Sequence, residues 1–92
     1  MVSTDMDTTT QTPDERTLLR AAGLRVTRPR VAVLTALGEC PHADAATVLA
    51  AVRRELPAVS HQAVYDSLHA LTEARLVRSL QPAGSTARYE LD

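Results

Sequence analysis

The sequence of 92 residues has no Phe, no Trp and a single cysteine. Because two tyrosines are its only aromatic residues, the core must be built from Ala, Val and Leu, and such packing favours helices. One cysteine excludes an internal disulfide and a Cys-pair zinc site within this sequence. No run approaches the roughly 18 apolar residues of a membrane-spanning helix, so we expect a cytoplasmic protein without a membrane partner.

An excess of charge of one sign is also missing. Ten Lys and Arg residues face 11 Asp and Glu residues, which gives a formal net charge of −1. The charges are nevertheless unevenly distributed along the sequence. Residues 16–38 carry five positive charges and no negative ones, and they follow an acidic N-terminal segment. The positive charges are Arg16, Arg20, Arg25, Arg28 and Arg30. Such a cluster favours a polyanionic partner, although each arginine alone is compatible with a solvated surface.

At this length we expect one small domain, which leaves no room for a cofactor domain beside a catalytic one. Residues 1–12 are polar and without apolar periodicity, and we predict a disordered tail there and a folded domain over residues 13–92. Apolar spacing and proline positions predict four helices, over 13–22, 28–39, 45–56 and 61–74. Their predicted caps are Thr12, Thr27, Asp44 and Ser60. Residues 76–80 and 86–91 predict a β-hairpin.

A helix-turn-helix followed by a hairpin is the order of a winged helix-turn-helix, a mainly α fold with a small β-hairpin. Helix 61–74 has an apolar back, and its front carries His61, Gln62, Tyr65, Asp66 and His69. A reading helix in the major groove needs such a front, and we place Ser60 and His61 at its DNA-facing start. In this interpretation Gln62 bonds an adenine edge, Tyr65 contacts a thymine methyl and Asp66 accepts from a cytosine amino group. The alternative is a helix whose polar face only meets water.

The arginines fit the same interpretation. Arg25 precedes a helix cap and is placed to enter a minor groove, while Arg28 and Arg30 suit phosphates. Arg78 and Arg88 lie on the predicted hairpin, where a wing meets the DNA backbone. Ser60 and His61 are adjacent, but no third partner or oxyanion site accompanies them, so we do not expect an enzyme. A winged-helix module that binds proteins remains the alternative function.

Three segments carry a family resemblance: AGLRVTRPR at 22–30, VSHQAVY at 59–65 and ARYEL at 87–91. They resemble the N-terminal, DNA-binding half of the ferric uptake regulator (Fur) family. Asp66, where many members have Arg, and the segment 41–44 resemble the actinobacterial FurA/CatR branch, which represses catalase-peroxidase genes. The resemblance implies a metal-responsive repressor that binds A/T-rich inverted repeats as a homodimer and controls oxidative-stress or metal-homeostasis genes. It also implies that Arg25 reaches a minor groove and that Tyr65 contacts thymine.

The resemblance further implies that His42 and Glu90 are ligands of a regulatory Fe²⁺, Zn²⁺ or Mn²⁺ site. Spacing alone favours the simpler interpretation, in which His42 is a polar loop residue and Glu90 is a charge at a strand end. Family members continue into a dimerisation domain with a His-rich segment, and this sequence ends at Asp92. We therefore expect half a metal site, no tightly bound metal, and a monomer or weak dimer.

Overall fold

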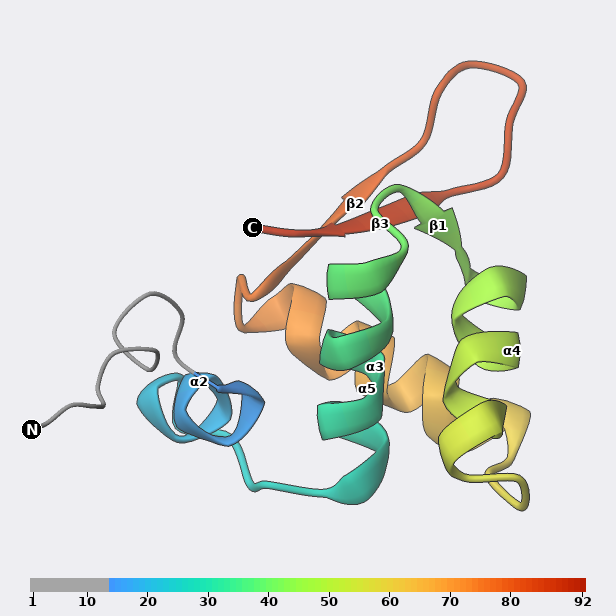
Figure 1. Ribbon diagram of the computed structural model, residues 1–92. Helices are drawn as coiled ribbons and strands as arrows, with labels where there is room; N and C mark the ends of the chain where they lie inside the picture. The colour runs from blue at the N-terminus through green and yellow to red at the C-terminus, as the bar shows by residue number, and fades with distance from the viewer. Residues whose placement is uncertain (1–13) are drawn as a thin grey trace, which may run out of the picture.

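The computed structural model describes residues 14–92, which form helices around a small sheet (Figure 1). The elements in chain order are α2 (Glu15–Ala21), α3 (Arg28–Glu39), β1 (Ala43–Asp44), α4 (Ala45–Glu55), α5 (His61–Glu73), β2 (Val77–Leu80) and β3 (Arg88–Leu91). Within this part of the chain no helix is long and apolar enough to cross a membrane. The predicted tail, residues 1–12, lies outside the described residues.

Polar side chains begin each of the long helices, as predicted. The hydroxyl of Thr27 accepts from the backbone N–H of Arg30 at 3.3 Å, and Asp44 and Ser60 make the equivalent bonds three residues ahead at 2.9 and 3.0 Å. The first described helix differs from prediction. Its cap is Asp14, whose carboxylate accepts from Thr17 N–H at 2.9 Å, so α2 begins two residues later than a cap at Thr12 would place it.

Helices α3, α4 and α5 pack their apolar faces together. Helix α3 contacts all three of the other helices, α2, α4 and α5. The side chains that are almost completely buried are Leu19, Leu37, Leu68, Leu71, Val33, Val48, Val52, Val64 and Val77. The core is thus aliphatic, as the missing aromatic residues required. Ser67 is the buried polar residue of this region, and its hydroxyl donates to the carbonyl of Ala63 at 2.8 Å.

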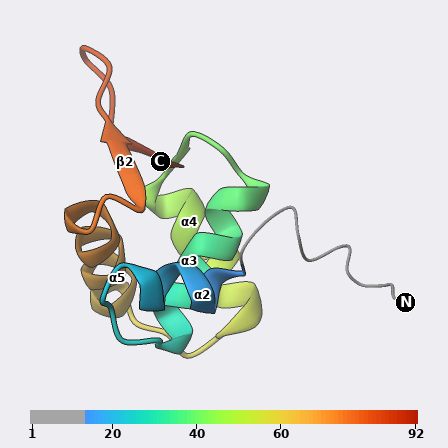
Figure 2. The same ribbon diagram turned by 90° about the vertical axis from the view of Figure 1, so that its left-hand side faces the viewer.

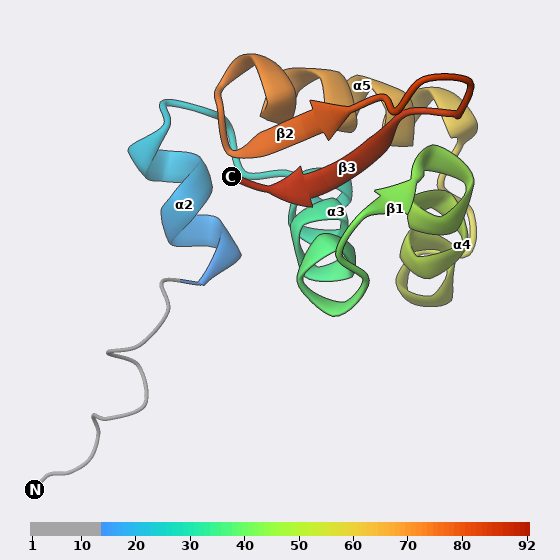
Figure 3. The same ribbon diagram turned by 90° about the horizontal axis from the view of Figure 1, so that it is seen from above.

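The hairpin is part of a three-stranded antiparallel sheet in the order β1–β3–β2. The sequence predicted β2 and β3 but missed β1, in which Ala43 pairs with Tyr89 and Asp44 with Arg88. Figure 3 shows β1 beside β3 and directly before α4. The sheet is therefore connected to the helices twice, through β1 to α4 and through β2 to α5. The loop between β2 and β3 projects away from the helices (Figures 1 and 2), as expected of a wing.

Candidate DNA interface and metal-ligand pair

The outward face of α5 is open to solvent. His61, Gln62, Tyr65, Asp66 and His69 are all exposed, whereas Val64, Leu68 and Leu71 on the opposite face are buried. Tyr65 is 46% exposed, which is unusual for the larger apolar side chains of this domain. The helix is therefore docked by its back and presents a hydrogen-bonding front with one aromatic ring.

Two pairs of side chains on this front interact one helical turn apart. Gln62 Nε2 donates to Asp66 Oδ1 at 2.8 Å. The rings of His61 and Tyr65 meet edge to face, with centroids 6.0 Å apart and an interplanar angle of 71°. These contacts restrict side chains that would otherwise move freely in water.

The basic connection between α2 and α3 lies on the α5 side of α3. Figures 2 and 3 agree on this placement of residues 22–27. Arg25 and Arg28 are exposed, while Arg30 is half-buried and donates from Nη1 to the carbonyl of Arg25 at 2.9 Å. Gly23 helps to turn the chain here with φ of 78°, a left-handed conformation that glycine adopts without steric cost. This hydrogen bond from Arg30 stabilises the backbone of the connection at Arg25.

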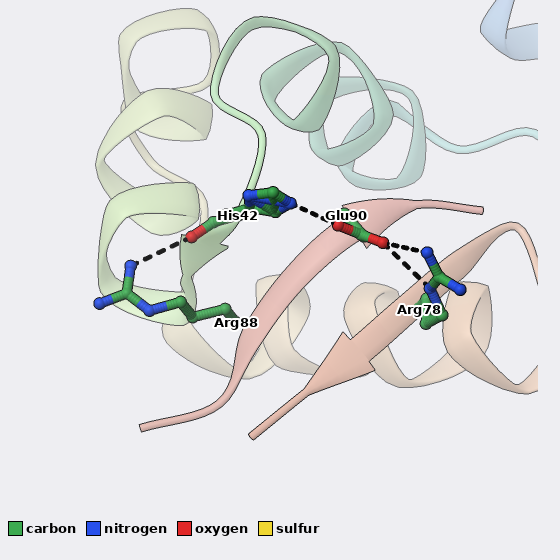
Figure 4. Close-up of polar contacts among 4 residues, drawn as sticks. All are labelled: His42, Arg78, Arg88 and Glu90. Carbon is green, nitrogen blue, oxygen red and sulfur yellow. Dashed lines mark hydrogen bonds and ion pairs between the residues drawn. The ribbon is translucent and has the colours of Figure 1, made fainter. Parts of the chain in front are cut away.

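The two wing arginines have protein partners. Arg78 donates from Nε to Glu90 Oε2 at 3.0 Å and also pairs with that oxygen through Nη2. These bonds raise the pKa of the Arg78 guanidinium. Arg88 donates from Nη1 to the carbonyl of His42 at 3.2 Å (Figure 4). Both arginines remain exposed, so their hydrogen bonds hold them at the protein surface and do not bury them.

His42 and Glu90 are brought together by the sheet (Figure 4). Nε2 of His42 lies 2.6 Å from Oε1 of Glu90, because His42 precedes β1 and Glu90 lies on the neighbouring β3. His42 also adopts φ of 65°, a left-handed conformation that non-glycine residues rarely occupy. The side chain of His42 is 62% exposed and that of Glu90 only 15%.

One imidazole nitrogen and one carboxylate oxygen are donors that suit Fe²⁺, Zn²⁺ and Mn²⁺. The donor chemistry therefore fits a divalent metal, but two donors are fewer than the four of a tetrahedral site. Among residues 14–92 no group of three or more His, Cys, Asp or Glu side chains is arranged to hold a metal ion. The described residues contribute a pair of ligands and no more.

A cavity of about 330 Å³ lies at the junction of α5 and the sheet. It is lined by Tyr65, Leu68, His69, Thr72, Ser79 and Tyr89. Ser79 and Tyr89 are cross-strand partners in the β2–β3 ladder. Sequence analysis did not place either residue at the interface, since only the strand pairing brings them beside α5. The available signal was the alternation of side chains between the two faces of a strand, which places every second residue of β2 and β3 on the same face of the sheet.

Comparison with known proteins decides between the families that share such a fold. The sequence pattern of the Ferric uptake regulator family matches residues 21–92. The chain belongs to the ferric uptake regulator family. Transcriptional regulator FurA of Mycobacterium tuberculosis is 65% identical over 78 residues, which cover 85% of this chain and 53% of that protein. Ferric uptake regulation protein 2 of Mycolicibacterium fortuitum is 60% identical over 81 residues, covering 86% of this chain and 56% of that protein.

Solved structures of Fur proteins share the fold. The ferric uptake regulator of Vibrio cholerae, whose structure revealed a rearrangement of its DNA-binding domains, superposes with a TM-score of 0.75 at 29% identity, over 86% of this chain and 62% of that one. The Pseudomonas aeruginosa regulator, solved with manganese, gives 0.74 at 35% identity, over 84% and 59%. The predicted winged helix is confirmed. The chain spans about half the length of the relatives it matches, and these relatives are regulators rather than enzymes.

Proposed function

We propose that this Fur-family chain is the DNA-binding part of a metal-responsive transcriptional repressor, and that α5 reads an A/T-rich inverted repeat. The observation that carries the proposal is the exposed front of α5, together with the basic α2–α3 connection, which lies on the same side of α3 as this helix (Figures 2 and 3). A major groove admits one helix, and flanking arginines neutralise the phosphates on either side of it.

Each group in this interface has a role. Tyr65 lays its ring against a thymine methyl, Gln62 meets an adenine edge, and His61 and Ser60 lie at the end of α5 nearest the backbone. Arg25 enters the adjacent minor groove, where negative potential is strongest over A/T-rich sequence. Arg28 and Arg30 neutralise phosphates, and Arg78 and Arg88 of the wing follow the backbone.

The metal would be held by His42 and Glu90 together with ligands from outside residues 14–92. A bound Fe²⁺, Zn²⁺ or Mn²⁺ supplies positive charge at the base of the wing, close to Arg78 and Arg88. The relatives' names, a transcriptional regulator and a ferric uptake regulation protein, support regulation of metal-homeostasis genes. The resemblance of the segments at 41–44 and 64–66 adds oxidative-stress genes as the alternative targets. We propose that the regulator is cytoplasmic and homodimeric.

A salt series with two duplexes tests the DNA-binding function. The chain is titrated, by electrophoretic mobility shift, with an A/T-rich palindrome and with a scrambled duplex of the same composition. We expect tighter binding to the palindrome, and a logarithm of affinity that falls with the logarithm of salt at a slope of roughly −3 to −4 for four phosphate contacts. Equal or absent binding to both duplexes would favour the protein-interaction module instead.

A further inference from the structure

The contact between Gln62 and Asp66 fixes which way the Gln62 amide faces. An ionised carboxylate only accepts hydrogen bonds, so the amide group that faces Asp66 Oδ1, 2.8 Å away, must be the NH₂. The Gln62 carbonyl oxygen is consequently turned away from Asp66. Both side chains are exposed on the front of α5, beside Tyr65, and the carboxylate is one turn further along the helix.

The orientation leaves a defined pair of groups for a base. One N–H of Gln62 is used by Asp66, while the second N–H and the carbonyl oxygen remain available. Adenine presents an acceptor, N7, and a donor, N6–H, in the major groove, and this is the complement of the available pair. Guanine presents two acceptors, N7 and O6, so the Gln62 carbonyl would face O6 without a proton between them. A fixed amide therefore distinguishes adenine from guanine.

A free amide distinguishes them less well. Without Asp66 the terminal torsion of Gln62 is broad and roughly two-fold, so both NH₂ hydrogens can turn toward the acceptors of guanine. Asp66 also places a negative charge among phosphates, which lowers affinity for every duplex. The same side chain therefore has opposite effects on affinity and on base preference.

We propose that Asp66 is a positioning residue that sharpens the preference of α5 for adenine by orienting Gln62. This role differs from the direct contact with cytosine predicted from the sequence. It rests on the proposed function, because it needs α5 in the major groove. The edge-to-face contact of His61 and Tyr65 orders the neighbouring part of the same face, so the two intrahelical pairs hold the reading surface in place before DNA arrives.

The experiment compares four variants of the chain on a set of duplexes. In this set each A·T pair of an A/T-rich half-site is replaced in turn by G·C, and affinities are measured by isothermal titration calorimetry at one salt concentration. Asp66→Ala removes the acceptor and the charge, whereas Asp66→Glu keeps both. Gln62→Ala removes the reading group. Glu73→Ala removes an exposed negative charge from the other end of α5 and serves as the charge control.

We expect the unmodified chain to prefer adenine at one position by about 5- to 150-fold, the range of a good bidentate base contact. Asp66→Ala should bind every duplex more tightly and weaken that preference by about 1.5- to 2-fold, the contribution of an exposed Gln–Asp pair one helical turn apart. Asp66→Glu should keep it, Gln62→Ala should lose it, and Glu73→Ala should change affinity only. A preference of unchanged size in Asp66→Ala would overturn the positioning role. The role would also be overturned if the unmodified chain prefers cytosine at one position and Asp66→Ala loses that preference, since this result identifies a direct contact between Asp66 and the base. If the unmodified chain binds all duplexes equally, the proposed DNA-reading function fails instead.

Discussion

His42 and Glu90 are 48 positions apart in the sequence, yet Nε2 of the one lies 2.6 Å from Oε1 of the other. The pairing of β1 with β3 makes this contact, and Arg78 holds the second carboxylate oxygen of Glu90. Each of the two proposed metal ligands thus already has a polar partner within the protein. The pairing of β1 with β3 is sufficient to account for their proximity.

Metal removal should therefore leave the domain folded. We expect a chelator to leave the melting temperature of the chain unchanged, and added Mn²⁺ or Zn²⁺ to raise it only slightly, because two ligands give weak affinity and stabilisation grows as the logarithm of metal concentration over Kd. Circular dichroism melts check this. The small rise should vanish in His42→Ala. A shift of many degrees in the unmodified chain would contradict a two-ligand site.

Releasing Arg78 should strengthen contact with the DNA backbone. Glu90→Gln removes the charge that pairs with Arg78, so the guanidinium becomes available to a phosphate. We expect the salt slope of DNA binding to steepen by up to about 1, because the Arg78 charge that Glu90 neutralises in the unmodified chain becomes fully available to the phosphate beside it. The slope should return to that of the unmodified chain in the double variant Arg78→Ala/Glu90→Gln. A steeper slope that persists in the double variant would show a general charge effect.

Removing the exposed aromatic ring should impair reading but not folding. Tyr65→Ala is expected to lose about 1–3 kcal/mol of specific binding, since the ring contacts a thymine methyl, while the melting temperature stays near that of the unmodified chain. Footprinting and thermal melts measure the two effects separately. Tyr65→Phe keeps the ring and should keep most of the affinity. An unchanged footprint with Tyr65→Ala would remove this residue from the interface.

Loss of the α5 cap should cost stability. Ser60→Ala leaves the N–H of Ala63 without its 3.0 Å acceptor, and we expect a loss of about 1 kcal/mol, or about 4–8 °C in melting temperature for a domain of this size. Ser85→Ala, in the exposed wing loop, is the matched control and should have little effect. Equal melting of the two variants would mean that the cap does not stabilise α5.

Acid should destabilise the domain through two helix caps. Backbone N–H groups of Thr47 and Thr17 lower the pKa of the Asp44 and Asp14 carboxyls, because each N–H bonds to the charged form. A group whose pKa is lower in the folded state stabilises that state fully above its ordinary pKa. This stabilisation is lost as the pH falls through the lower, folded-state value.

Urea unfolding at several pH values measures this loss. We expect stability to fall as the pH drops below about 4, the ordinary pKa of an aspartate carboxyl, and less steeply in the double variant Asp14→Asn/Asp44→Asn, because asparagine caps helices without titrating. An identical slope in the double variant would assign the acid sensitivity to other carboxyls.

Local signals predicted the helices of this domain well. The caps Thr27, Asp44 and Ser60 and the apolar spacing that follows each of them act within a few residues, so the sequence alone contains what defines α3, α4 and α5. The exposed front of α5 followed from the same periodicity. Strand β1 did not, because two residues carry no periodicity and their partners on β3 lie far along the chain.

The same distinction applies to the side chains of the site. Resemblance suggested His42 and Glu90 as a pair, but neither residue type nor spacing shows that Arg78 shares the carboxylate. The Gln62–Asp66 contact was within reach of sequence analysis, because residues four apart on a helix are neighbours. What the sequence could not decide is whether Asp66 faces a base or Gln62, since both arrangements use the same exposed position.

The scarcity of aromatic residues has a practical consequence for the cavity between α5 and the sheet. Tyr65 and Tyr89 are the only two tyrosines, no tryptophan is present to mask them, and both line that cavity. Ultraviolet emission from the unlabelled chain therefore originates entirely at this junction. The molecule carries an intrinsic optical reporter where the reading helix and the wing meet.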